Sequence, residues 1–166
     1  MSEYKKPLSD VYFFWLERAL KAFRSKKAQV FKELGVNVTS DQWMVIKRTH
    51  EEPGINQIEL AQSIYKDPAS ITRIIDILVT RDLVERKKHP SDRRNYCIYL
   101  TADGEKLVER VLPVAIDMRK QGLANISEEE QLQLKNILDR ITQNLKQSWT
   151  GFEGQNRWLT SLHKLP

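Results

Sequence analysis

The sequence predicts a mainly α-helical protein that carries one small β-hairpin. Apolar residues recur at helical spacing through most of the 166 residues, and a strand-like alternation stands out only around residues 83–101. The composition, 40% hydrophobic and 30% charged, is ordinary for a globular protein. The net charge of +5 favours a polyanionic partner without proving one.

The N-terminal segment has the spacing of one amphipathic helix of about 25 residues, which Gly35 ends. Such a helix is longer than a small core needs, so it can reach a second domain or a partner. Its periodic apolar residues are Leu8, Val11, Tyr12, Trp15, Leu16, Ala19, Leu20, Phe23, Val30, Phe31 and Leu34.

Two shorter helices follow, and each has its own start signal. Thr39 and Gln42 have the spacing of a capping box before the helix that contains Trp43. Asn56, with Glu59 at the matching box position, begins a helix of two turns.

The next helix, residues 68–82, has the features of a recognition helix. Asp67 can accept hydrogen bonds from its first N–H groups, and Pro68 suits its first position. At 100° per residue, an apolar face lies opposite a small, polar and cationic face. The apolar face consists of Ile71, Ile74, Ile75 and Leu78, and the outer residues are Ala69, Ser70, Thr72, Arg73, Asp76 and Thr80. Together with the preceding helix, this segment predicts a helix-turn-helix. The alternative is that its outer face, with one arginine, contacts only solvent.

A basic hairpin follows directly. Residues 83–88 and 96–100 predict two strands, and residues 90–92 supply the turn. Lysines and arginines exceed acidic residues by three between positions 85 and 94, and the basic candidates for a DNA contact are Lys87, Lys88, Arg93 and Arg94. Asp92 is expected to orient Arg93 or Arg94 through a charge-assisted hydrogen bond. A helix-turn-helix followed by a basic wing predicts a winged helix that binds duplex DNA, whereas a hairpin that only protects a sheet edge is the alternative.

The C-terminal part of the sequence predicts further helices. Pro113 is expected to kink or interrupt the first of them, and Ser127 with Glu130 predicts a capping box for the last. The apolar stripe of the last helix is Leu134, Ile137, Leu138, Ile141, Leu145 and Trp149. We expect the apolar tail, residues 151–166, to pack against something.

Three stretches, TSDQWMVIK, NQIELAQSI and DPASITRIIDILVTRDLVERKKHPSDRRNYCIYLTADGEKL, resemble the MarR family of bacterial winged-helix transcription regulators. The sharpest part of the match is Asp92-x-Arg94 followed by Leu100-Thr101 and Gly104. The resemblance implies a homodimer on a palindromic operator, with Arg94 in the minor groove beside Asp92. It also implies that the recognition helix meets DNA at Ser70, Thr72 and Arg73.

The long apolar helices at the two ends of the chain independently predict a dimer, because they exceed what a small winged-helix core can bury. We therefore expect an N-terminal dimerisation helix in residues 1–36 and a DNA-binding lobe in residues 37–101. Residues 102–166 are expected to form C-terminal dimerisation helices and a tail. A two-fold dimer places its recognition helices about 34 Å apart.

The aromatic residues of VYFFWLERALKAF, together with Trp43, raise the question of a small-molecule site. A core stripe at helical spacing is the simpler interpretation, but the resemblance implies a phenolic or aromatic acid as effector at this junction. The candidate ligand residues are Tyr12, Trp15, Arg18 and Trp43.

Other classes of function find less support. The sequence has no metal-ligand spacing, phosphate-cradling glycine loop or nucleophile elbow, so we expect no enzyme, no cofactor and no metal. Cys97, the single cysteine, is either a redox-sensitive thiol near Arg93 and Arg94 or a small strand residue. Without a signal core or a membrane span, we expect a cytoplasmic protein that does not bind membranes. A winged-helix module that binds proteins is the alternative to a DNA-binding regulator.

Overall fold

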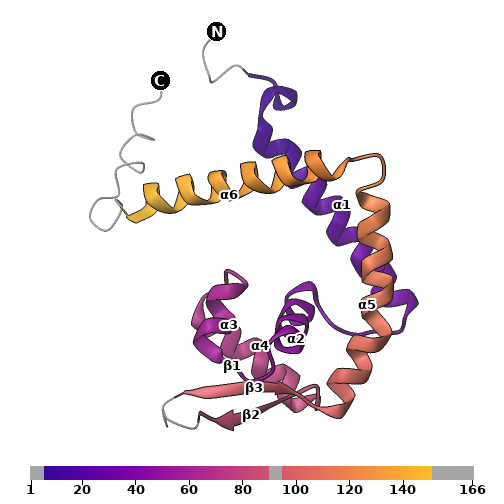
Figure 1. Cartoon of the computed structure of the whole chain (residues 1–166), viewed down its shortest axis with the longest axis vertical. Helices are drawn as coiled ribbons and strands as arrows, with labels where there is room; N and C mark the ends of the chain where they lie inside the picture. Colours follow the sequence, from indigo (N-terminus) through magenta and orange to yellow (C-terminus); the bar gives the residue numbers. More distant parts are fainter. Residues whose placement is uncertain (1–5, 90–94, 151–166) are drawn as a thin grey trace, which may run out of the picture. The chain divides into compact units, whose positions relative to one another are not determined.

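The computed structural model describes residues 6–89 and 95–150, with side chains up to residue 145. The chain divides into two compact units, Met1–Gly122 and Leu123–Pro166. Within the described residues, the first unit contains five α-helices and a three-stranded sheet, and the second contains one helix (Figure 1). This architecture confirms the predicted fold class.

The long N-terminal helix is α1 (Tyr12–Glu33), and the chain leaves it through Gly35 at a φ of 63°. The helical spacing therefore predicted the end of α1 but not its start. Leu8, counted in the predicted helix, lies in a separate 3-10 helix (Leu8–Asp10), and Val11 is extended. Its buried side chains, Lys27, Val30 and Phe31, lie in its C-terminal part. The apolar stripe before them stays largely exposed in the single chain.

Three helices build the centre of the first unit: α2 (Ser40–Glu51), α3 (Gln57–Ser63) and α4 (Pro68–Thr80). The predicted capping box begins α2. The Gln42 backbone N–H donates to the Thr39 hydroxyl at 3.2 Å, and the Thr39 N–H donates to the Gln42 side chain at 2.9 Å.

The sheet consists of β1 (Ile55–Asn56), β2 (Val84–Lys88) and β3 (Tyr96–Leu100), all antiparallel in the order β1-β3-β2. The sequence predicted the two long strands but not β1, because two residues are too few to show an alternation. Gly54 precedes β1 at a φ of 85°, and a Cβ there would lie 2.6 Å from the Tyr99 hydroxyl. A glycine is therefore needed where the third strand joins the hairpin.

Asn56 also caps α3, as its sequence position predicted. Its Oδ1 accepts hydrogen bonds from the backbone N–H groups of Ile58 at 2.7 Å and Glu59 at 3.3 Å. One residue thus ends a strand and begins a helix, which makes the connection between β1 and α3 very short.

The core lies between these helices and one face of the sheet, and α5 (Ala102–Gly122) closes it. Its fully buried side chains come from α2, α3, α4, β2, β3 and α5: Val45, Ile46, Thr49, Leu60, Ile71, Ile75, Leu78, Val84, Ile98, Val108 and Val111. Every element of the predicted winged helix therefore contributes to one common core.

α5 runs without a break through Pro113. Of the two effects expected at this residue, a kink or an interruption, the interruption was therefore wrong. Pro113 is exposed, whereas Val111 and Ala115 on either side of it are buried. Burial of the apolar face holds the helix together across the one hydrogen bond that a proline cannot donate.

The second unit contains α6 (Glu128–Thr150), which begins at the predicted capping box. The Ser127 N–H donates to the Glu130 carboxylate at 2.7 Å, and the Glu130 N–H donates to the Ser127 hydroxyl at 3.2 Å. These bonds lower the pKa of the Glu130 carboxyl. The side chain of Trp149 and the tail from residue 151 lie outside the described residues.

Across the described ranges, residues 6–89 and 95–150, no helix combines the length and the apolar character that crossing a membrane requires.

Gly104→Ala should lower the free energy of unfolding by about 1–3 kcal/mol, because its Cβ would lie 2.1 Å from the Leu83 carbonyl oxygen and force the backbone apart. Gly122→Ala is the matched control on the same helix, since its Cβ meets no atom within 4 Å. Urea denaturation of both variants measures the difference. A Gly104→Ala variant as stable as the wild type would contradict the close approach of α5 to this loop.

Candidate nucleic-acid interface

The helix α4 begins at a well-formed N-cap. The Asp67 carboxylate accepts a hydrogen bond from the Ser70 backbone N–H at 2.8 Å, and Pro68 occupies the first turn. Hydrogen bonds from the Ser70 side chain and backbone lower the pKa of the Asp67 carboxyl. The start of α4 is therefore fixed, and so is the direction in which each later side chain points.

The outer face of α4 presents the residues that the sequence predicted there. Ala69 and Arg73 are exposed, and Ser70 is half-buried beside the cap. The small side chain of Ala69 leaves room for a nucleic acid to approach the helix closely. Arg73 offers a planar set of hydrogen-bond donors that suits guanine or phosphate. The N-terminal half of α4 thus has the chemistry of a recognition helix.

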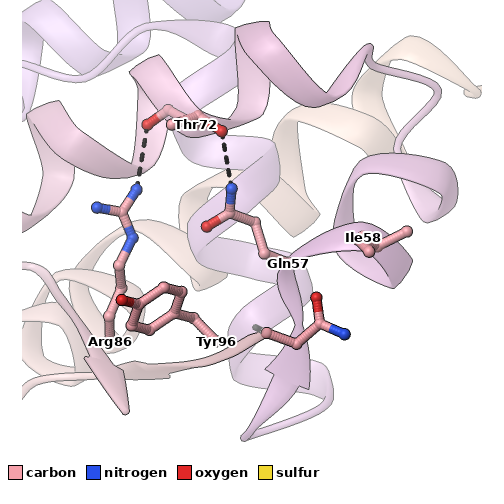
Figure 2. Close-up of a pocket in the computed structure, with 6 residues that line it drawn as sticks. Gln57, Ile58, Thr72, Arg86 and Tyr96 are labelled. Atoms are coloured by element: carbon pink, nitrogen blue, oxygen red, sulfur yellow. Dashed lines mark hydrogen bonds between the residues drawn. The ribbon is translucent and has the colours of Figure 1, made fainter. Parts of the chain in front are cut away.

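Thr72 is more constrained than the sequence suggested. Its hydroxyl donates to the Pro68 carbonyl at 2.9 Å and accepts from Nε2 of Gln57 at 2.8 Å; Figure 2 shows the second of these bonds. A hydroxyl has one proton to donate, so Thr72 cannot donate to a phosphate or base while both bonds persist.

The strand register places Lys87 and Lys88 on opposite faces of the hairpin. Lys87 shares its face with Glu85, with which it forms a 2.7 Å ion pair, and its Nζ lies 4.7 Å from the ring centroid of Tyr99. The hydrogen bond to Glu85 raises the pKa of Lys87. Lys88 is exposed and shares the face of Arg86, which contacts α4. Lys88 is therefore the better placed of the two lysines to act together with α4.

Asp92, Arg93 and Arg94 lie outside the described residues, so the roles assigned to them from the sequence stay predictions. The base of the hairpin is described, and there the His89 N–H donates to the Asn95 carbonyl at 3.0 Å. This bond fixes the two points between which the tip is attached.

Arg86 connects the wing to α4, although the sequence reasoning did not single it out. Its Nη1 lies 2.5 Å from the Asp76 carboxylate, and its Nη2 donates to the Thr72 carbonyl at 3.3 Å, as Figure 2 shows for Thr72. The Arg86 side chain is 24% exposed, compared with 56% for Lys87. The alternation along β2 could have indicated an inward role for Arg86, because Arg86 falls on the same face of the strand as the buried Val84.

A cavity of about 200 Å³ lies at the junction of α1, α2 and α5. Its walls are mostly apolar, but three cationic side chains also line it. The lining residues are Phe23, Lys27, Trp43, Met44, Lys47, Leu112, Ala115, Met118 and Arg119. An apolar hollow with several cations suits a small organic anion.

Among the four residues predicted to bind a ligand, Trp43 lines this cavity and the other three do not. Tyr12 is 85% exposed. The Arg18 guanidinium lies 5.0 Å from the ring centroid of Trp15, in the N-terminal half of α1. The cavity thus shares only Trp43 with the predicted ligand residues, and it takes part of its wall from α5, which the prediction did not include.

Lys27 is the most buried cation at this cavity, with 8% of its surface exposed. Its Nζ lies 5.3 Å from the ring centroid of Phe23. Burial, assisted by the nearby charge of Arg24, lowers the pKa of Lys27, while Asp41 acts in the opposite direction. A cation in this setting is stabilised by an added anion.

Two comparisons with known proteins decide the family. The profile of the MarR family matches residues 38–96. The transcriptional regulator HosA of Escherichia coli O111:H- is 30% identical over 95 residues, which cover 57% of this chain and 70% of HosA. The chain belongs to the MarR family. The resemblance that the sequence motifs indicated is thereby confirmed.

Solved structures of MarR-like regulators extend the match beyond the winged lobe. The transcriptional regulator SlyA has a TM-score of 0.73 and 25% identity, covering 86% of this chain and 99% of SlyA. A cysteine-to-serine mutant of MarR from E. coli, solved with operator DNA, has a TM-score of 0.62 and 26% identity, covering 76% of this chain and 92% of MarR. The match to MarR-like regulators thus includes residues outside the winged helix.

Cys97, the thiol weighed earlier as a redox sensor, is buried in β3. A buried thiol lacks the access that oxidant sensing requires. In residues 6–89 and 95–150, three or more histidine, cysteine, aspartate or glutamate side chains nowhere gather in a way that could hold a metal ion.

Asp67→Ala should lower the free energy of unfolding near neutral pH, because α4 loses its cap. The folded state lowers the Asp67 pKa, so this contribution is present above the unfolded value of about 3.9 and disappears as the pH falls through the lower folded value. Asp67→Asn is the control, since asparagine caps a helix but does not titrate. Denaturation at several pH values tests this, and a loss that is the same at every pH would contradict it.

Proposed function

We propose that the protein is a cytoplasmic transcription regulator that binds duplex DNA, with α4 in the major groove and the β2–β3 wing against the minor groove. The observation that carries the proposal is the exposed Arg73 beside Ala69 on the outer face of a capped α4, next to a basic wing. The complex of the E. coli MarR mutant with operator DNA supports it at 26% identity. Residues 37–101 form the DNA-binding lobe in this proposal.

The protein is proposed to act as a homodimer built from residues 1–36 and 102–166. Single soluble chains rarely leave this much apolar helix surface uncovered. The large exposed side chains of α1 are Tyr12, Phe13, Trp15, Leu20 and Phe23, and those of α6 include Leu132, Leu134, Ile137, Leu138 and Leu145. A two-fold dimer presents two copies of α4 to a palindromic operator at a spacing of about 34 Å.

The alternative function, a winged-helix module that binds an acidic protein, uses the same basic surface. The two functions differ in their response to salt, because DNA binding releases counterions that had condensed on the phosphates. They also differ in the need for a defined base sequence.

An operator can first be obtained by selecting random duplexes that bind the protein. Binding to this operator duplex should weaken linearly in log affinity as log salt rises. Lys88→Ala should weaken it by about 1 kcal/mol and lower the salt slope by about one, as expected for a lost phosphate contact. Lys87→Ala is the matched control, because Lys87 lies on the other face of the hairpin and is paired with Glu85. Fluorescence anisotropy at several salt concentrations measures both, and a flat salt response would favour the protein-binding alternative.

The junction cavity is proposed to hold a phenolic or aromatic acid whose binding changes DNA affinity. The ring would lie against Trp43 and Phe23, and the carboxylate would pair with Lys27. This placement satisfies a buried cation that burial otherwise penalises.

Salicylate should bind the wild type with measurable heat in a calorimetric titration. Lys27→Met should weaken this binding at least about tenfold, because it removes a charge-assisted hydrogen bond. Binding should also weaken as the pH rises through the lowered Lys27 pKa, since the cation is then lost. Arg18→Met removes the same charge at an exposed site away from the cavity and should change little. Equal effects of the two variants would contradict the site.

A further inference from the structure

We infer that Arg86 is a positioning residue for DNA binding, which holds the recognition helix at a fixed distance from the wing and neutralises the Asp76 carboxylate. The inference rests on the proposed DNA binding and assigns a role to a residue that lies behind the contact surface. Arg86 acts through Thr72 and Asp76, both of which belong to α4.

The geometry of the contact is that of a two-point clamp. One nitrogen of the guanidinium binds the side chain of Asp76, and a second binds the backbone carbonyl of Thr72, one turn earlier in α4. Gln57 of α3 binds the hydroxyl of the same threonine, so the N-terminal half of α4 is held by two elements (Figure 2). A planar guanidinium can satisfy two acceptors at once, whereas a lysine ammonium cannot reproduce this geometry.

Polar contacts matter here because packing between the wing and the helices is incomplete. A pocket of about 410 Å³ lies beside the clamp, and its walls come from α3, α4, β2 and the start of β3. Its lining residues are Gln57, Ile58, Thr72, Arg86, Asn95 and Tyr96. Beside this open space, the hydrogen bonds that join Arg86 of β2 to α4 set the distance between α4 and the outer part of the wing.

Stability alone is a poor explanation for an arginine at this position. The side chain of Asp76 is 56% exposed, and exposed ion pairs contribute little to the free energy of folding. The Nε atom of Arg86 is buried and has no hydrogen-bond partner in the part of the chain that the structure describes. A buried donor without a partner costs stability.

The clamp also solves an electrostatic problem for a DNA-binding helix. Asp76 is exposed on α4, one turn after Arg73, and an unpaired carboxylate there would repel phosphates. Pairing with Arg86 cancels this charge and at the same time uses it to hold the helix. The net charge of the DNA-binding surface does not reveal that the Asp76 carboxylate also holds α4 in place.

The competing role for Arg86 is a direct phosphate contact, and a double-mutant cycle separates the two. The variants are Arg86→Gln, Asp76→Asn and the double variant, each measured by anisotropy on the operator duplex at several salt concentrations. If Arg86 is a positioning residue, both single variants should weaken DNA binding, and Arg86→Gln should weaken it by about tenfold. The slope of log affinity against log salt should stay unchanged in both. The double variant should then bind no more weakly than Arg86→Gln alone.

The result that overturns the inference is equally specific. If Asp76→Asn binds as tightly as the wild type or more tightly, while Arg86→Gln lowers the salt slope by about one, Arg86 is a phosphate contact. Arg48→Gln is the matched control, because Arg48 is an arginine of similar exposure that pairs with Glu51 at the end of α2 and with Glu52 just after it. It should change affinity by less than about twofold.

Two further measurements keep the test decisive. Thermal unfolding of every variant shows whether a loss of binding follows from a loss of folding. If Arg86→Gln does not fold, Arg86→Lys replaces it, and it should fold and bind with intermediate affinity because it pairs with one acceptor only. A wild type that binds no duplex sinks the proposed function, whereas a wild type that binds without coupling between Arg86 and Asp76 sinks this inference alone.

Discussion

The burial of one face of α4 is the constraint on which the rest of the lobe depends. Ile71, Ile75 and Leu78 are fully buried in the common core, so the rotation of the helix about its own axis is fixed. Because side chains advance by 100° per residue, the outward positions of Ala69 and Arg73 follow directly. The Asp67 cap then fixes where the helix begins, and the two constraints together determine which residues can meet a ligand.

Apolar packing and polar contacts constrain α4 in different ways. The core fixes its rotation, but apolar contacts are not directional, so they specify the position of each outer side chain less sharply than hydrogen bonds do. The bonds of Thr72 to Gln57 and Arg86 are directional, and they hold the exposed side of α4 against α3 and β2. A recognition helix needs both, because base recognition depends on position as well as on the face presented.

The sequence predicted most of the fold because four of the helices carry a start signal at the residue just before them. Capping residues and apolar periodicity act within one or two turns, which is why the starts of α2, α3, α4 and α6 were all predicted correctly. The features that the sequence did not reveal depend on contacts between distant segments. β1 exists because residues 55 and 56 pair with β3, and Arg86 matters because it meets Asp76 across the fold. The continuity of α5 through Pro113 also depends on burial, which no local rule supplies.

The candidate site was predicted unevenly for the same reason. Arg73 and Ala69 follow from the periodicity of one helix, whereas the hydroxyl of Thr72 is occupied by a residue fifteen positions away, Gln57. Tyr12, Trp15 and Arg18 were chosen for their chemistry on one helix, but a cavity requires walls from several helices, and α5 supplies four of its lining residues. Among the four candidates, only Trp43 of α2 has both a suitable side chain and a position in the wall of the cavity.

The position of α2 gives the cavity a physical route to the recognition helix. On one side α2 lines the cavity through Trp43 and Met44. On the other side Asp41 forms a 2.7 Å ion pair with Lys66, the residue just before the cap of α4. A ligand that shifted α2 would therefore act on the start of α4, the helix that we propose meets DNA. Linkage would make this coupling reciprocal, so DNA that held α4 in place would change the affinity of the proposed ligand site by the same factor.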